Sequence, residues 1–210
     1  MKRLLTIFTL TVFLAILTGT ASAVTYSGSA LSGLTYVGSP SSDAQYVAGT
    51  PDVASLYTAN SGTADADDSP AVFVRGPLGT LSSFSASYSL YGAATGPTGT
   101  SPYWILWLTG VSTPIVGMGD TTLNGSSQVH MGNLINGTTA LADLYTLYGG
   151  YTVAWAGVEI GNWDNGTAII PASANIESIT ITSSVPEPAT MLLLGLGLMG
   201  LAGIRRKFKR

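Results

Sequence analysis

Hydrophobic and polar residues alternate one by one in two stretches of this 210-residue chain. In residues 84–90, written FSASYSL, an apolar side chain occupies every second position and serines fill the positions between them. In residues 179–182, isoleucine alternates with threonine in the same way. Successive side chains of a strand point to opposite faces, so this period of two predicts half-buried β-strands with one face in the core.

Residues 103–108, YWILWL, form an unbroken apolar run with turn residues on each side, which predicts a strand. Because apolar side chains occupy both parities, we expect a central strand that is covered on both faces. Further strands are expected in AVFVRG, SQVHMG, YTVAWAGVEIG, TAII and NIESITIT. Helical spacing is confined to TTALADLYTLYGG, where Leu141, Leu144 and Leu147 are in phase and Gly149 is placed to end the helix.

These elements predict an all-β domain, a single antiparallel β-sandwich that is jelly-roll-like, while the strand order stays open. The absence of a repeat with a fixed period argues against a solenoid or a propeller. Three Asn-Gly pairs, at Asn124, Asn136 and Asn165, favour tight hairpin turns, because both residue types adopt positive φ angles readily. Each pair is followed by Ser or Thr, so a glycosylation sequon is the alternative interpretation.

The N-terminus has the three parts of a secretory signal peptide. MKR is basic, LLTIFTLTVFLAIL is apolar, and TGTASA is small. Ala21 and Ala23 bracket Ser22 in the pattern that signal peptidase requires, so residues 1–23 are expected to be removed. An uncleaved N-terminal anchor is the alternative.

The C-terminus carries a second apolar segment, which begins at Ala189 and ends at Ile204. At ~1.5 Å per residue it reaches only about 24 Å as a helix, whereas a bilayer core is roughly 30 Å thick. Its glycines lower the helix propensity, which favours a temporary anchor, although close helix packing would also explain them. The basic residues that follow hold the end on the cytoplasmic side: Arg205, Arg206, Lys207, Lys209 and Arg210.

Directly before this segment stands the hexapeptide VPEPAT: Val185, Pro186, Glu187, Pro188, Ala189 and Thr190. The tail of residues 185–210 resembles the PEP-CTERM sorting signal of Gram-negative bacteria. That resemblance implies processing by exosortase, a membrane protease. The two prolines favour an extended backbone, which suits recognition by a protease, and a Pro-rich juxtamembrane linker is the alternative.

The net charge of the segment between the two terminal signals limits the partners that are expected for it. Residues 24–184 contain ten acidic residues against Arg75 alone, a net charge of about −9 without any lysine. Nucleic acid and anionic membranes demand basic patches, so neither is expected as a partner. Divalent cations and neutral polysaccharides remain compatible. The chain has no cysteine, which excludes disulfides and thiolate metal sites.

Few residues suggest catalysis, and no catalytic residue is assigned. The single histidine, His130, is expected on a strand face opposite its apolar neighbours, and no Gly-x-Ser-x-Gly turn presents a serine nucleophile. Glu159 and Asp164, on either side of Trp163, are the best pair for glycoside hydrolysis, which needs two carboxyl groups about 5 to 10 Å apart. A solvated hairpin explains this pair equally well.

Two weaker sites complete the candidates. Asp65, Asp67 and Asp68 offer the oxygen ligands that calcium prefers, but a plain acidic loop is favoured because the EF-hand glycine and glutamate are missing. Trp163 is the tryptophan expected to be partly exposed and able to stack on a sugar. The other three tryptophans lie in predicted strands and are expected in the core: Trp104, Trp107 and Trp155.

The sequence therefore predicts an exported protein with three parts: a signal peptide (1–23), an acidic ectodomain (24–184) and a sorting signal (185–210). The sorting signal is expected to anchor it transiently in the inner membrane before release to the surface or beyond. The expected role is structural or adhesive, and the resemblance to PEP-CTERM proteins implies a link to exopolysaccharide and biofilm. The alternatives are a carbohydrate-binding module or polysaccharide-acting enzyme, recognised by an exposed aromatic row or a carboxylate pair in a cleft, and a permanently anchored surface domain.

Overall fold

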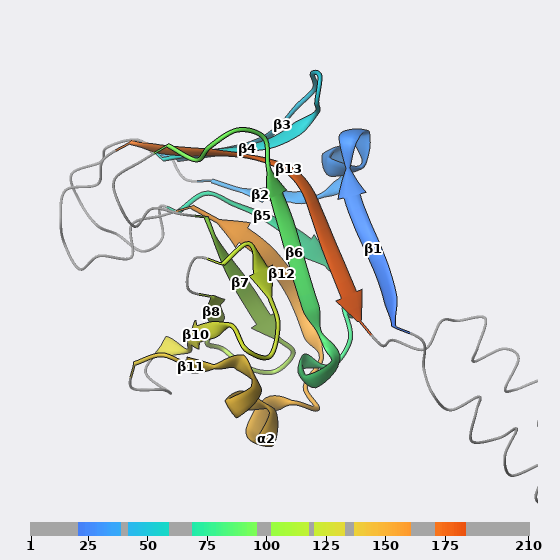
Figure 1. The fold of residues 1–210 in the computed structure, drawn as a ribbon, viewed down its shortest axis with the longest axis vertical. Coiled ribbons are helices and arrows are strands. Elements are labelled where there is room, and N and C mark those ends of the chain that lie inside the picture. The colour runs from blue at the N-terminus through green and yellow to red at the C-terminus, as the bar shows by residue number, and fades with distance from the viewer. Residues whose placement is uncertain are drawn as a thin grey trace, which may run out of the picture. The chain divides into compact units, whose positions relative to one another are not determined.

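The computed structural model describes residues 21–38, 42–58, 69–95, 102–117, 120–132, 137–160 and 171–183. The described strands form two sheets whose strand pairs are antiparallel (Figure 1), which confirms the predicted all-β class. The contacts of residues Ala23–Ser183 group them into one unit. The signal peptide before residue 21, the sorting hexapeptide and the basic tail lie outside the described residues.

Six of the described strands make up the first sheet, called here the six-stranded sheet. Along it run β3 (Ser42–Val47), β4 (Val53–Thr58), β13 (Ala172–Ser183), β6 (Ser85–Leu90) and β9 (Thr122–Leu123). The long strand β13 pairs with β4 through its first half and with β6 through its second half, while β1 (Ser22–Ser27) also pairs with it.

The second sheet, called here the seven-stranded sheet, has the order β11, β10, β8, β7, β12, β5, β2. Its central strands are β7 (Tyr103–Leu108), β12 (Val153–Glu159) and β5 (Ala71–Arg75). The outer strands are shorter: β11 (Thr139–Ala140), β10 (Gln128–His130), β8 (Ile115–Gly117) and β2 (Thr35–Val37). Neighbouring strands are mostly distant in sequence, so the chain crosses repeatedly between the sheets.

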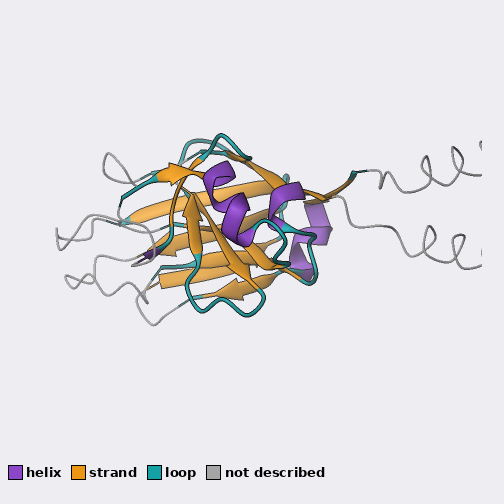
Figure 2. Ribbon diagram, turned by 90° about the horizontal axis from the view of Figure 1, so that it is seen from below, coloured by secondary structure: helices purple, strands orange, loops and turns teal. Residues whose placement is uncertain are grey.

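One hydrophobic core lies between the two sheets, which form the two layers visible in Figure 2. From the six-stranded sheet, Tyr88 and Ile179 point into it. From the seven-stranded sheet, Trp104, Leu106 and Val158 do the same. All five are buried, so the inward positions of the alternating strands supply the apolar surface that holds the sandwich together.

The strand predictions from hydrophobic pattern are confirmed wherever the chain is described. The alternating stretch at 84–90 forms β6, the apolar run forms β7, and residues 175–182 belong to β13. The expected strand at 167–170 lies outside the described residues. Seven described strands were not predicted: β1 to β4, β8, β9 and β11. Small and polar residues such as Ser, Thr, Ala and Gln interrupt the alternation in β1 to β4, and β8, β9 and β11 are only two or three residues long.

The predicted helix exists but is shorter than the expected segment 138–150, whose residues Thr139–Ala140 form strand β11. A 3₁₀ turn, η5 (Leu141–Leu144), leads into one α-helical turn, α2 (Tyr145–Tyr148), with Gly149 as the C-cap. Leu141 and Leu144 are buried, but Leu147 is 71% exposed, so the three leucines that are in phase in the sequence do not share one buried face. Leu147 turns away because residues 141, 144, 145 and 148 share the inward face, with the two tyrosines packed against the core. The other helical turns are also 3₁₀: η1 (Gly28–Gly33) and η3 (Leu81–Ser83).

The first Asn-Gly pair forms a turn, but not a hairpin. The Asn124 side-chain oxygen accepts hydrogen bonds from the Ser126 backbone N–H (2.9 Å) and hydroxyl (2.7 Å). This turn joins β9 of one sheet to β10 of the other, so the hairpin prediction is wrong here. The side-chain bonds allow Asn124 to turn the chain without a positive φ, which among the described residues only glycines adopt. Asn136 and Asn165 lie outside the described residues.

Strand β1 contains the predicted signal-peptidase site. Ala23 is its second residue, so cleavage there would leave a strand that begins at Val24. The Thr25 and Thr180 hydroxyls, 2.9 Å apart, join β1 to β13, two residues beyond that point. Within the described part of the chain, no helix is both long enough and apolar enough to cross a membrane. The predicted membrane segment of the tail is not within that part.

Candidate functional site

The outward face of the seven-stranded sheet carries a second apolar cluster, separate from the core. Every second residue of β5 and β7 points to it, among them Ala71, Phe73 and Ile105, which are buried. Tyr103, Trp107 and Trp155 pack against this cluster and are only half-buried. The predicted central position of β7 is confirmed, but its predicted coverage on both faces is not, because this outer face is only partly buried and its side chains are largely aromatic.

Strand register arranges this cluster in three rungs, each of which is a set of three residues that are paired across β5, β12 and β7. The first rung is Arg75, Trp155 and Trp107, each paired with the next. The second is Phe73, Gly157 and Ile105, and the third is Ala71, Glu159 and Tyr103. Neighbouring strands are about 4.8 Å apart, so paired side chains on one rung can contact the same ligand.

An open groove of about 510 Å³ lies over these rungs. Its volume is in the range of sites that hold small molecules or a few sugar rings. Most of its lining is apolar or aromatic, and Glu159 is its charged member. The lining residues are Val37, Ser69, Ala71, Phe73, Ile105, Trp107, Leu108, Ala154, Trp155 and Glu159.

Gly157 gives the middle rung its shape. A Cβ atom at this position would lie 2.4 Å from Cδ1 of Phe73 and 2.6 Å from the Val72 carbonyl oxygen. Only a residue without a side chain therefore allows the Phe73 ring to lie over β12. The ring fills the space that a side chain at Gly157 would take and so forms part of the groove lining.

Trp155 is held in place from two sides. The Phe73 ring meets it edge-on, with centroids 5.8 Å apart and an interplanar angle of 67°. The Arg75 guanidinium carbon lies 3.9 Å from the centroid of the Trp155 ring, in a cation–π contact. Arg75 is the single basic residue of residues 24–184, so the whole positive charge of the ectodomain lies on this tryptophan.

Glu159 supplies a carboxyl group at the third rung. The Tyr103 hydroxyl donates a hydrogen bond of 2.7 Å to its Oε1 atom, and Ser69 donates another to the carboxyl group. Burial raises the pKa of Glu159 above its ordinary value, and these two hydrogen bonds offset the shift in part. Burial also raises the pKa of Tyr103, which the adjacent Glu159 charge increases further, so the tyrosine stays protonated and remains a donor.

The tryptophan expectations are only partly correct. Trp104 is 1% exposed and lies in the core, as expected. Trp107 and Trp155 are half-buried on the outer face, so their expected place in the core is wrong. Strand parity explains the difference, because Trp107 shares its face with Tyr103 and Ile105 rather than with Trp104. Trp163, the tryptophan expected to stack on sugar, lies outside the described residues.

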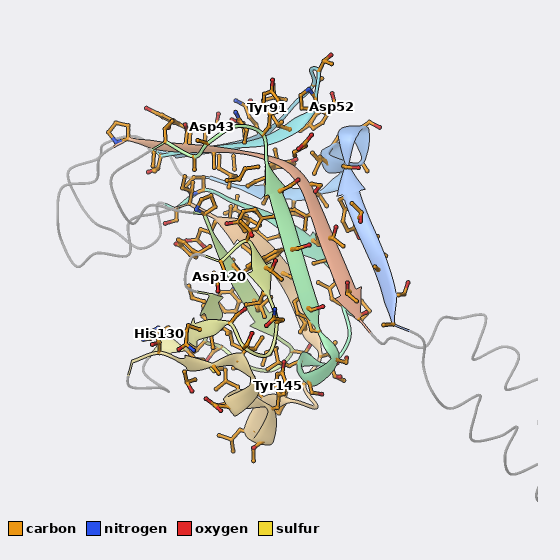
Figure 3. The ribbon with its side chains drawn as sticks, viewed as in Figure 1. Asp43, Asp52, Tyr91, Asp120, His130 and Tyr145 are labelled. Atoms are coloured by element: carbon orange, nitrogen blue, oxygen red, sulfur yellow. The ribbon has the colours of Figure 1, made fainter. Side chains whose placement is uncertain are left out.

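The described part of the chain contains none of the predicted calcium ligands and no other metal site of acidic residues. There, no group of three His, Cys, Asp or Glu residues could hold an ion. Figure 3 shows Asp120 well separated from Asp43 and Asp52. The proposed calcium ligands are outside the described residues: Asp65, Asp67 and Asp68.

The two catalytic candidates have different surroundings. Glu159 faces the groove, but its predicted partner Asp164 lies outside the described residues. His130 is on β10, between the buried Val129 and Met131, and its Nδ1 atom accepts a hydrogen bond of 3.2 Å from the Gly132 N–H. Its strand β10 lies next to the edge strand β11 and three strands from β12, which carries Glu159.

Comparison with known proteins identifies the tail. Residues 184–207 match the family model of the PEP-CTERM protein-sorting motif. The resemblance seen in Val185, Pro186, Glu187 and the basic end is thereby confirmed. A protein with a PEP-CTERM motif is exported, anchored transiently in the membrane and processed by exosortase. No curated protein matches the chain, so the ectodomain must be understood from its own residues.

Proposed function

We propose that this exported protein binds extracellular polysaccharide through the aromatic groove and has an adhesive or structural role in the matrix of the cell. The observation that carries the proposal is the partly exposed pair Trp107 and Trp155, which lie side by side on one rung in an open groove. Apolar surface left open in a soluble domain favours a binding role, since water contact there is unfavourable.

The chemistry of the groove suits a sugar chain. Sugar rings have an apolar C–H face that packs on flat aromatic side chains, and a rim of hydroxyls that needs hydrogen-bond partners. The groove supplies both, because its aromatic rings adjoin a carboxyl group and two hydroxyls, those of Glu159, Tyr103 and Ser69. The sorting signal supports the same proposal, because export delivers the domain to a compartment rich in polysaccharide.

Binding to a panel of soluble polysaccharides tests the proposal. The full chain, purified in a non-ionic detergent, is run in native gels containing each polysaccharide, and retardation measures affinity. At least one polysaccharide should retard it, and Trp107→Ala combined with Trp155→Ala should weaken this binding at least about tenfold. Tyr57→Ala is the matched control, because Tyr57 is an exposed aromatic residue on the other sheet. Equal losses in both variants would contradict the proposal.

Hydrolysis by Glu159 and Asp164 is the competing function, and we propose binding without turnover. Glu159 lies in the groove, so the two functions would use the same surface. Long incubation with the bound polysaccharide should release no new reducing ends. Release that stops in Glu159→Gln would establish the enzyme instead.

The processing of both ends is proposed from the same sorting route. The intact mass of protein released by the native host should correspond to a chain that starts at Val24 and ends between Pro186 and Thr190. A membrane-bound form still ending at Arg210 would establish the permanent anchor in its place.

A further inference from the structure

Glu159 is an unusual group to find among aromatic rings. Its carboxyl lines the groove together with Trp107, Trp155 and Phe73. Tyr103 and Ser69 each donate one hydrogen bond to it. An ionised carboxylate has about four lone-pair sites, so these two bonds leave acceptor capacity for a ligand.

The charges around the groove favour a cation as that ligand. The net charge of residues 24–184, about −9, attracts positive groups to the domain. The faces of tryptophan and tyrosine rings attract cations as well. Arg75 does not neutralise Glu159. It is paired with Trp155, which lies four residues, or about 13 Å, from Glu159 along β12.

Burial of the Glu159 carboxylate also favours a positively charged ligand. Removing a carboxylate from water disfavours its charged form, which raises the pKa of Glu159. A cation beside it would restore the charged form and form a charge-assisted hydrogen bond. A neutral ligand leaves this cost in place.

We infer that the groove selects a sugar chain whose residues carry protonated amines, with one ring packed on Trp107 and Trp155 and the ammonium of a residue further along the chain on the Glu159 carboxylate. This inference rests on the proposed function and names the class of sugar. An N-acetylated sugar would present an uncharged amide at the same place and would bind more weakly. A cationic peptide has similar charge but lacks the flat ring, so it should bind more weakly too.

A pair of oligosaccharides that differ only in acetylation tests the inference. Glucosamine tetrasaccharide and N-acetylglucosamine tetrasaccharide are titrated calorimetrically into the full chain in non-ionic detergent, at a pH that keeps the amine protonated. The wild type should bind the amine form at least about tenfold more tightly. Glu159→Gln should remove this preference while the thermal unfolding transition is retained.

Glu177→Gln is the matched control. It removes the same charge from β13, on the other sheet, and should keep the preference. Equal weakening by both variants would mean non-specific charge attraction and would overturn the inference, as would tighter binding of an oligolysine peptide. If the wild type binds both sugars equally and loses both in the double tryptophan variant, the inference fails and the proposed function stands. If no sugar and no polysaccharide binds, the proposed function fails as well.

Discussion

Along β6 and β13 of the six-stranded sheet, most outward positions carry hydroxyl side chains, whereas β5, β7 and β12 of the seven-stranded sheet carry aromatic rings among theirs. Ser89 pairs with Ser178, and Thr180 pairs with Ser87, which in turn pairs with Thr122. The Ser89 and Ser178 hydroxyls lie 2.7 Å apart and bond to each other. The corresponding rung on the other sheet holds Arg75, Trp155 and Trp107.

The different residue types on the two outward faces indicate which face is suited to bind a ligand. Hydroxyl groups can bond to each other and to water, so the first face needs no partner to satisfy it. Aromatic rings in an open groove retain contact with water, and a ligand that displaces this water gains free energy. Because the strand geometry is the same on both sheets, the residue type at alternate positions decides the role of each face.

The largest difference in stability between variants of the two faces is expected from a substitution that adds a side chain at Gly157. Gly157→Ala places a methyl group against Phe73 and the Val72 carbonyl, so the free energy of unfolding should fall by about 1–3 kcal/mol. Polysaccharide binding should weaken at the same time, because the groove lining must move. Ser87→Ala on the other sheet should change stability by less than about 0.5 kcal/mol. Urea unfolding measures both, and similar values would refute the special packing at Gly157.

A smaller loss is expected when the hydroxyl face is altered. Ser89→Ala removes the hydrogen bond to Ser178 and should lower the free energy of unfolding by about 0.5–1.5 kcal/mol. Polysaccharide affinity should not change, because this pair lies on the opposite sheet from the groove. A change in affinity would show that the hydroxyl face also takes part in binding.

Removing the cation–π contact should have a modest effect on stability and a clear one on binding. Arg75→Met keeps an extended apolar side chain but loses the charge above Trp155, at a cost of about 0.5–1 kcal/mol. Polysaccharide affinity should fall by severalfold because Trp155 is less well held. Arg75→Lys keeps the charge and should restore part of the affinity. Equal losses in both variants would mean that charge is unimportant here.

The smallest expected effect is a pH dependence of stability that comes from Glu159. Burial raises the pKa of Glu159 in the folded protein above its value in the unfolded chain. The folded protein therefore holds this proton more tightly, and the resulting stabilisation is complete below the unfolded-state pKa and is lost as the pH rises through the folded-state pKa. Glu159→Gln should therefore gain stability relative to the wild type between about pH 4 and about pH 7. Thermal unfolding at both pH values checks this. A constant difference between the two proteins would contradict it.

The amino-acid pattern predicted the strands of the core well, because their inward residues are strongly apolar. Strand β7 and the alternating β6 and β13 follow directly from periodicity. Strands β1, β2 and β4 pair with strands distant in sequence, and such partners leave no local signal, whereas β3 pairs with the adjacent β4 but has a mainly polar sequence. Strand order was unpredictable for the same reason.

The groove could have been found in part from the sequence. Tyr103, Ile105 and Trp107 occupy alternate positions of β7, opposite to those that point into the core, and such a second set of apolar residues indicates a second apolar face. What the sequence lacked was the register that sets Trp107 beside Trp155 and Arg75 beyond it, since these residues come from three separate segments. The sorting tail needed no such information, because its three parts are contiguous.

The most direct test of polysaccharide binding at the groove is NMR of the tryptophan indole N–H signals of the full chain in detergent, titrated with a polysaccharide that it binds. Single Trp→Phe variants assign the signals. The signals of Trp107 and Trp155 should shift with a common saturation curve, while that of the core residue Trp104 stays in place. Unchanged signals from Trp107 and Trp155 at saturation would contradict binding in the groove.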